Sequence, residues 1–214
     1  KHLVIAPPVL LDKENPGSWT NAFEDFGVRQ SNFVSIGKLD TLLDGNSDKY
    51  ENVFIDEAHR MRNADTATYE KLTEICRGKR VILVSATPYN NSPMDILSLV
   101  QLFQKPRNST LPLLKNLDGF FRSLDSNIKK EDRRKDYPSF LKVTEDNAKA
   151  VRDKVLKYLM VRRTRSDIVN FFSEDLNNQG LEFPEVMQPQ PLYYKLSDKE
   201  SKIFDKTIDM LANK

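Results

Sequence analysis

The 214-residue chain has a formal net charge of +2 and 39% hydrophobic residues, a globular composition that excludes extensive disorder. Its longest apolar runs are only a few residues long, so the sequence predicts no transmembrane segment and no membrane partner. Cys76 is the only cysteine and His2 and His59 are the only histidines, which excludes an internal disulfide and argues against a Cys/His zinc site. The default expectation is a reducing cytoplasmic setting, or the nucleoid or nucleus.

Four short apolar runs alternate with helix-like segments along the first half of the chain: 3–6, 33–36, 53–55 and 81–86. Each run is continuous rather than alternating, as expected of parallel strands covered on both faces. Between them, Ser18 can cap a helix with Trp19 and Phe23 on one face, and a second apolar stripe ends near Gly78. The order strand, helix, strand, helix predicts a βαβ sheet.

After Lys105 this alternation stops at a turn-rich connection. Residues 117–128 are expected to form a helix, and the mixed-charge run 129–138 is expected to be a solvated loop. A long helix is predicted from Thr144 onward, because apolar residues recur there at helical spacing.

The last part of the chain predicts an extended stretch followed by a helix. Leu192, Tyr194 and Leu196 alternate with polar residues, which is typical of a strand. Ser197 and Glu200 have the spacing of a capping box that opens the final helix.

The segment YENVFIDEAHRMRN ends an apolar run in two acids. In an open parallel sheet, ligands bind beyond the carboxyl ends of the strands, where Asp56 is expected. An acid there can hold Mg²⁺ through water, since this ion prefers oxygen ligands and retains several waters, and Glu57 would orient or deprotonate the attacking water. The cation and its phosphates would compensate the cost of burying the acids. The alternative is that the two acids merely begin a solvated loop.

The run DEAHRMRN resembles motif II of helicase superfamily two, and in particular that of the Swi/Snf-type DNA translocases. Other segments resemble this family's motifs in the same order: LVIAPPVLLDKENPGSWTNAFEDF motif Ia, FVSIGKLDTLL motif Ib, and VILVSATPYNNSPMDILSLVQLF motif III. YLMVRRTRSDI is similar to its double-Arg element, and FPEVMQPQPLYYKLSDKESKIFDK to the strand and helix that follow. The resemblance covers nearly the whole chain and is loosest from Asn108 to Asn147.

The resemblance implies an α/β fold, a RecA-like parallel sheet flanked by helices, as an incomplete first motor lobe with a helical insertion. Residues 1–106 would be the C-terminal part of the first ATPase lobe, and residues 107–182 the insertion. Residues 183–214 would be a strand and helix that close the lobe and lead to a second lobe.

By the same resemblance, the protein would be an ATP-dependent DNA translocase or helicase that uses ATP and Mg²⁺. The implied catalytic residues are Asp56, which positions Mg²⁺ through water, Glu57 and His59. The residues that would couple the nucleotide to the nucleic acid are Ser85, Ala86 and Thr87. Those that would contact nucleic acid, with double-stranded DNA as the first expectation, are Pro7, Pro8, Ser35, Lys38, Arg162 and Arg163.

Several alternatives stay open at this stage. Ser85 and Thr87 could simply cap the next helix, and the arginine pair could form ion pairs that fix the insertion rather than contact DNA. Trp19 is expected to pack in the core rather than stack on a base. The protein could also be an RNA helicase of the same superfamily, or a catalytically dead nucleic-acid-binding scaffold.

The sequence departs from the family at two points. Ala86 stands where the Swi/Snf branch usually has Gly, and none of the seven glycines begins a GxxxxGK loop followed by Ser or Thr. Gly37-Lys38 and Gly78-Lys79 come nearest. Because such a loop cradles the β- and γ-phosphates, we expect it to precede Lys1 in a longer protein, and we expect the 214 residues alone to be inactive.

Overall fold

The computed structural model describes residues 1–45, 47–86, 92–185 and 187–212. Thr87, a predicted coupling residue, lies outside these described residues. The chain divides into two compact units, Lys1–Met160 and Val161–Lys214, which are described separately below.

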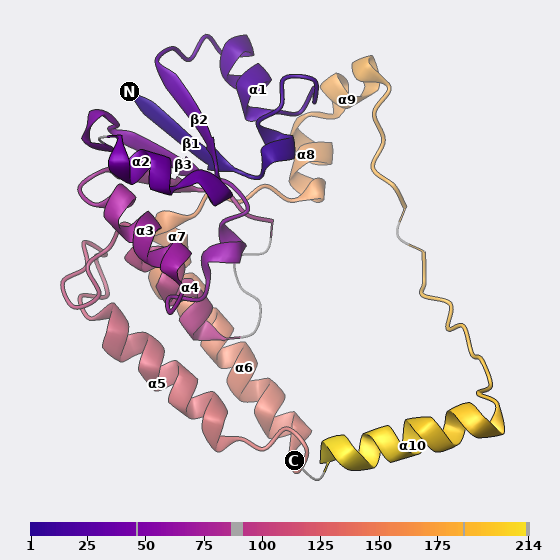
Figure 1. Ribbon diagram of the computed structural model, residues 1–214. Helices are drawn as coiled ribbons and strands as arrows, with labels where there is room; N and C mark the ends of the chain where they lie inside the picture. The colour runs from indigo at the N-terminus through magenta and orange to yellow at the C-terminus, as the bar shows by residue number, and fades with distance from the viewer. Residues whose placement is uncertain (46, 87–91, 186, 213–214) are drawn as a thin grey trace. The chain divides into compact units, whose positions relative to one another are not determined.

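The first unit contains a parallel four-stranded sheet (Figure 1), which confirms the predicted α/β fold. Its strands are β1 (His2–Ala6), β2 (Ser31–Ser35), β3 (Asn52–Ile55) and β4 (Arg80–Leu83), in the order β2-β1-β3-β4. β1 pairs with β2 and β3, and β3 pairs with β4, all in parallel. The four carboxyl ends therefore lie at one edge of the sheet.

A helix follows each strand of this sheet. These helices are α1 (Trp19–Asp25), α2 (Asp40–Asp44), α3 (Ala67–Cys76) and α4 (Pro93–Gln101). Short 3₁₀ turns accompany them at Pro8–Leu10, Ile36–Lys38, Ser47–Lys49 and Ala58–Met61. The side chains of Ser18, Thr66 and Ser92 accept backbone N–H bonds at the starts of α1, α3 and α4, so local sequence sets where each of these helices begins.

Apolar side chains cover both faces of the sheet. On one face, Leu3 and Ile55 belong to a buried cluster with Leu72 of α3 and Leu99 of α4. On the other face, β1 packs with Phe23 of α1. Figure 1 shows α1 on one side of the sheet and α3 and α4 on the other. This double cover explains why β1 and β3 are apolar without alternation.

After α4, the first unit continues through a turn-rich connection, residues 102–116, into further helices. It contains α5 (Leu117–Lys130), α6 (Tyr137–Val151), a π-helical segment (Arg152–Leu156) and α7 (Lys157–Leu159). Phe121 of α5, Val151 of α6 and Val155 are fully or almost fully buried against α4 residues such as Ile96. Helix α4 thus packs against both the sheet and the helical part.

The second unit contains α8 (Arg165–Phe171), α9 (Ser173–Gln179) and α10 (Asp198–Ala212). Ser197 and Glu200 form the predicted contacts at the start of α10. The described residues from 181 to 197 form no strand, so the alternation of Leu192, Tyr194 and Leu196 does not produce one. The proposed division of the chain at residues 106 and 182 stays a prediction.

Across the part of the chain that the structure describes, no helix has the length and apolar character needed to cross a membrane.

Candidate nucleotide and nucleic-acid site

The two acids of the YENVFIDEAHRMRN segment lie at the carboxyl edge of the sheet. The backbone N–H of Asp56 donates to the carbonyl of Ile5 at 2.9 Å, which continues the β1–β3 ladder by one residue. The N–H of Ala58 donates to the carbonyl of Val84 at 3.0 Å, at the end of β4. Asp56 and Glu57 are therefore fixed where three neighbouring strands end, which is the ligand-binding edge of open parallel sheets.

The carboxylate of Asp56 accepts a hydrogen bond at each oxygen. The indole Nε1–H of Trp19 donates to Oδ2 at 2.6 Å, and the backbone N–H of Glu57 donates to Oδ1 at 2.7 Å. Asp56 is half-buried, so these two donors offset part of the cost of removing its charge from water. Each oxygen still has a lone pair with which to accept a bond from water.

Glu57 adopts a left-handed backbone conformation, with φ 51° and ψ 40°. This region costs a residue with a side chain roughly 1–2 kcal/mol relative to its ordinary conformations. The 3₁₀ turn that follows is held by the buried side chains of Ala58 and Met61, and the N–H of Arg60 donates to the Glu57 carbonyl at 2.9 Å. Packing of the turn thus imposes the strained conformation on the acid, as happens at many functional sites.

His59 contacts both the second acid and the end of the next strand. Its Nδ1 lies 3.1 Å from Oε2 of Glu57 and 3.3 Å from Oγ of Ser85. Ser85 is half-buried and Ala86 is exposed, two and three residues past the end of β4. The segments that resemble motifs II and III are therefore in contact through His59 and Ser85.

A hollow of about 630 Å³ lies beside the edge strand β2. Its lining includes Pro8, Ser35 and Lys38, three of the predicted nucleic-acid contacts, together with Leu11. Pro7 precedes the 3₁₀ turn at Pro8–Leu10, and its carbonyl accepts a bond from the N–H of Leu10 at 3.0 Å. Three of the predicted contacts thus line one hollow, and Pro7 lies next to Pro8 at its edge.

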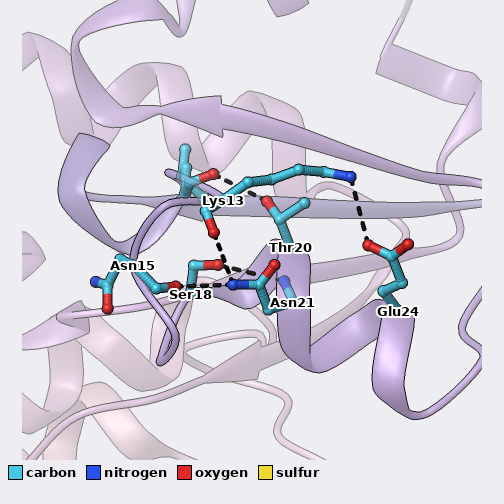
Figure 2. A network of polar contacts seen from close by, with 7 residues as sticks. Lys13, Asn15, Ser18, Thr20, Asn21 and Glu24 are labelled. Atoms are coloured by element: carbon cyan, nitrogen blue, oxygen red, sulfur yellow. Dashed lines mark hydrogen bonds and ion pairs between the residues drawn. The ribbon is translucent and has the colours of Figure 1, made fainter.

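Side chains of α1 donate hydrogen bonds to the loop that follows this turn (Figure 2). Asn21 Nδ2 donates to the carbonyls of Lys13 and Asn15, at 3.0 and 2.9 Å. Thr20 Oγ1 donates to the carbonyl of Leu11 at 2.9 Å. The loop and the first turn of α1 are therefore one hydrogen-bonded structure.

Arg162 and Arg163 lie in the second unit and are exposed. They precede a capping box in which Thr164 and Asp167 exchange hydrogen bonds at the start of α8. The bonds from the side chain and backbone of Thr164 lower the pKa of Asp167, and the nearby arginines lower it further. Among the described residues of the second unit, neither arginine forms a salt bridge, and the choice between DNA contact and ion pairing stays a prediction.

The donor set at Asp56 fits a magnesium ion that keeps most of its waters. Such an ion binds through one or two carboxylates and takes the remaining oxygens from water and phosphate. In the described part of the chain, no three His, Cys, Asp or Glu side chains gather into a metal-binding group. Asp56 would hold the ion, and Glu57 is the acid beside it.

Sequence reasoning missed the contact between Trp19 and Asp56. Trp19 was expected to pack in the core, and it does contact Phe23 and Phe54, with ring centroids 5.6 and 5.9 Å away. Its half-buried position also leaves the indole N–H in need of an acceptor. The need of an indole N–H for an acceptor can be inferred from the sequence, but the sequence does not identify Asp56 as that acceptor.

A parallel sheet between helices, with two acids at the carboxyl edge, defines an α/β protein of the RecA-like class. The SNF2-related domain family matches residues 4–212. The chain therefore belongs to the SNF2-related domain family, and through it to the superfamily of ATP-dependent helicases and translocases. No curated protein matches the chain.

Proposed function

We propose that this chain supplies the magnesium-binding and water-activating part of the ATPase site in a DNA translocase or helicase. The observation that carries the proposal is the arrangement of Asp56, Glu57 and His59 at the carboxyl edge of the sheet, where three strand ends meet. Asp56 holds Mg²⁺ through water. When bound, the ion would supply positive charge that offsets the negative charge developing during phosphoryl transfer.

Glu57 orients the attacking water or removes its proton. A carboxylate suits this role because it only accepts hydrogen bonds when ionised. The turn at Ala58–Met61 fixes its backbone, and Nδ1 of His59, 3.1 Å from its Oε2, restrains its side chain.

His59, with the segment Ser85, Ala86 and Thr87, couples the nucleotide to the nucleic acid. Nδ1 of His59 reaches both Glu57 and Ser85, so a change at one partner alters the bond available to the other. A switch of hydrogen-bond partners as the γ-phosphate leaves is a simple relay between two sites. The alternative in which Ser85 caps the next helix is wrong, because the N-cap of α4 is Ser92.

Nucleic acid, in the first place double-stranded DNA, binds across the hollow lined by Pro8, Ser35 and Lys38. These residues offer a cation, a hydroxyl and backbone groups, which suit phosphate contacts and do not read bases. Pro7 helps shape the turn beside the hollow. Arg162 and Arg163, in the second unit, are exposed and offer separate cations for phosphate contacts. Binding should therefore be insensitive to sequence and sensitive to salt.

The phosphate-binding loop of this ATPase comes from outside the 214 residues. They contain no GxxxxGK sequence followed by Ser or Thr, so they provide no such cradle for the β- and γ-phosphates. The 214-residue chain by itself should neither bind ATP tightly nor hydrolyse it. Nucleic-acid-stimulated ATPase activity of this chain alone would contradict that expectation.

The test compares ATP hydrolysis by a protein that contains this chain and a phosphate loop in the presence of single-stranded DNA, duplex DNA or RNA. Stimulation by duplex DNA is expected to be strongest, and stimulation by RNA alone would favour an RNA helicase. Glu57→Gln should still bind nucleotide but turn over little. Full activity of Glu57→Gln would overturn the assignment, and absence of hydrolysis in the unchanged protein would favour a scaffold.

A further inference from the structure

We propose that Trp19 is a positioning residue for Asp56, and that its indole N–H sets the orientation of the carboxylate. The inference rests on the proposed role of Asp56 in holding magnesium. Trp19 Nε1 lies 2.6 Å from Oδ2 of Asp56, although the two residues are 37 positions apart in the sequence. No role for Trp19 follows from the family match alone.

The indole has one N–H, and its surroundings direct that N–H to Asp56. The ring packs edge-on against Phe23, with centroids 5.6 Å apart and planes at 72°, and tilted against Phe54 at 5.9 Å. Phe54 lies on β3, two residues before Asp56. Aromatic contacts therefore fix the ring plane, and the single donor of the indole is used on the carboxylate.

The two donors to Asp56 act on different oxygens. Trp19 binds Oδ2 and the backbone N–H of Glu57 binds Oδ1, so rotation of the carboxyl group would break both bonds. The Glu57 N–H belongs to the strained turn that follows β3, while the indole belongs to α1. Asp56 is therefore restrained both by α1 and by the turn after β3. Its remaining lone pairs keep one orientation, which a water-mediated metal site requires.

Helix α1 is itself fastened to the loop beside the hollow. Ser18, which is fully buried, caps α1 through a bond from the N–H of Asn21, and Thr20 binds the carbonyl of Leu11, which lines the hollow. Trp19 lies between these two capping and anchoring residues. The indole that donates to Asp56 therefore belongs to the helix that is hydrogen-bonded to Leu11, a residue that lines the candidate nucleic-acid surface.

The first experiment uses the fact that Trp19 is the only tryptophan in the chain. In the 214-residue chain labelled with ¹⁵N-tryptophan, the indole gives one N–H resonance in the NMR spectrum. Asp56→Ala should move the indole proton upfield, because the bond to a carboxylate is lost. Asp56→Asn, which keeps a weaker acceptor, should move it less in the same direction. Asp25→Asn, at the far end of α1, is the matched control and should leave the resonance in place.

The second experiment removes only the donor. Trp19 is replaced by 3-benzothienylalanine, which keeps the shape of the ring system but has sulfur in place of the N–H, in an ATP-hydrolysing protein that contains this chain. The Mg²⁺ concentration for half-maximal hydrolysis should rise by roughly 10- to 100-fold, as for other outer partners of metal ligands, with little change in Tm. Trp19→Phe should show the same rise together with a lower Tm.

An indole proton that does not respond to Asp56→Ala would overturn the proposal. So would an unchanged Mg²⁺ requirement after donor removal, because the contact would then serve stability alone. Failure of the proposed function gives a different pattern: Asp56→Asn would leave hydrolysis unchanged while the indole proton still moved. Restoration of the normal Mg²⁺ requirement by 5-fluorotryptophan, which keeps the N–H, is the expected rescue.

Discussion

Nδ1 of His59 lies 3.1 Å from Oε2 of Glu57, and the same nitrogen lies 3.3 Å from Oγ of Ser85. A carboxylate only accepts hydrogen bonds, so Nδ1 must carry a proton to bond with Glu57. The hydroxyl of Ser85 can donate to Nδ1 only when that nitrogen has no proton. A protonated Nδ1 can donate to Glu57 or to the hydroxyl oxygen of Ser85, whereas an unprotonated Nδ1 can bond only with Ser85, by accepting from its hydroxyl.

Replacement of His59 by Ala should weaken coupling more than basal hydrolysis. Glu57 would lose its contact with Nδ1 of His59, and Ser85 would lose its hydrogen bond to the same nitrogen. We expect the ratio of DNA-stimulated to basal ATP hydrolysis to fall by about 2- to 30-fold, the range typical of residues between two coupled sites. Steady-state ATPase assays with and without duplex DNA measure this ratio.

Ser85→Ala is the companion variant, because it removes the other partner of Nδ1 and leaves Glu57 in contact with His59. Ser85→Ala should lower the ratio of DNA-stimulated to basal ATP hydrolysis by a smaller factor than His59→Ala does. An equal fall of basal and stimulated rates in His59→Ala would show that the histidine serves only the chemical step.

The left-handed backbone of Glu57 predicts a gain in stability when the side chain is removed entirely. Glu57→Gly should unfold with a free energy about 1 kcal/mol larger than Glu57→Ala, because only glycine adopts φ 51° without strain. Both variants lack the carboxylate, so the comparison isolates the backbone. Urea unfolding followed by circular dichroism measures the difference, and equal midpoints would mean that the turn imposes no strain.

The sheet and the place of the two acids were predictable because local patterns determine them. Continuous apolar runs identify parallel strands, and the first polar residues after such a run must lie at the carboxyl edge. The residues predicted from this pattern, Asp56 and Glu57, lie there in the structure. By contrast, the bond from Trp19 to Asp56 joins α1 to the end of β3, and no local pattern reports a contact over 37 positions.

The start of α6 was misplaced although its signals are local. The run 129–138 was expected to be a loop, with a helix from Thr144, but α6 begins at Tyr137. The side chain of Asp136 accepts a bond from the N–H of Ser139, and Pro138 occupies the first turn, where its missing N–H costs nothing. The many charged residues of the segment are typical of a solvated loop, so they favour a loop over the helix start that Asp136 and Pro138 indicate.

Lys38 should contribute one phosphate contact to DNA binding. Lys38→Ala is expected to weaken binding of duplexes of unrelated sequence by similar factors and to reduce the slope of log K against log salt by about 1. Fluorescence anisotropy at several salt concentrations measures both quantities. Lys142→Ala, an exposed lysine of α6, is the matched control and should leave the slope unchanged. A Lys38→Ala slope equal to that of the unchanged protein would exclude the hollow as the phosphate-binding surface.

The first unit should lose stability in alkaline solution through two buried groups of α3. Burial raises the pKa of the Cys76 thiol from an ordinary 9.0 to about 12, and that of Tyr69 from 10.0 to about 12. The hydroxyl of Tyr69 also donates to the carbonyl of Ser98 at 2.7 Å, a bond that needs its proton.

Because both pKa values are raised on folding, the neutral forms favour the folded state. Their contribution is complete below about pH 9 and is lost progressively as the pH rises toward about 12. Urea midpoints at pH 8, 10 and 11 should fall in this order, and Cys76→Ala should show a shallower fall, whatever its absolute stability. In the difference between the unchanged chain and Cys76→Ala, which cancels the tyrosine absorbance, the thiolate absorbance near 240 nm should stay absent at pH 10 in the folded state and emerge on addition of urea. A native thiolate signal at pH 10 would mean that burial does not protect Cys76.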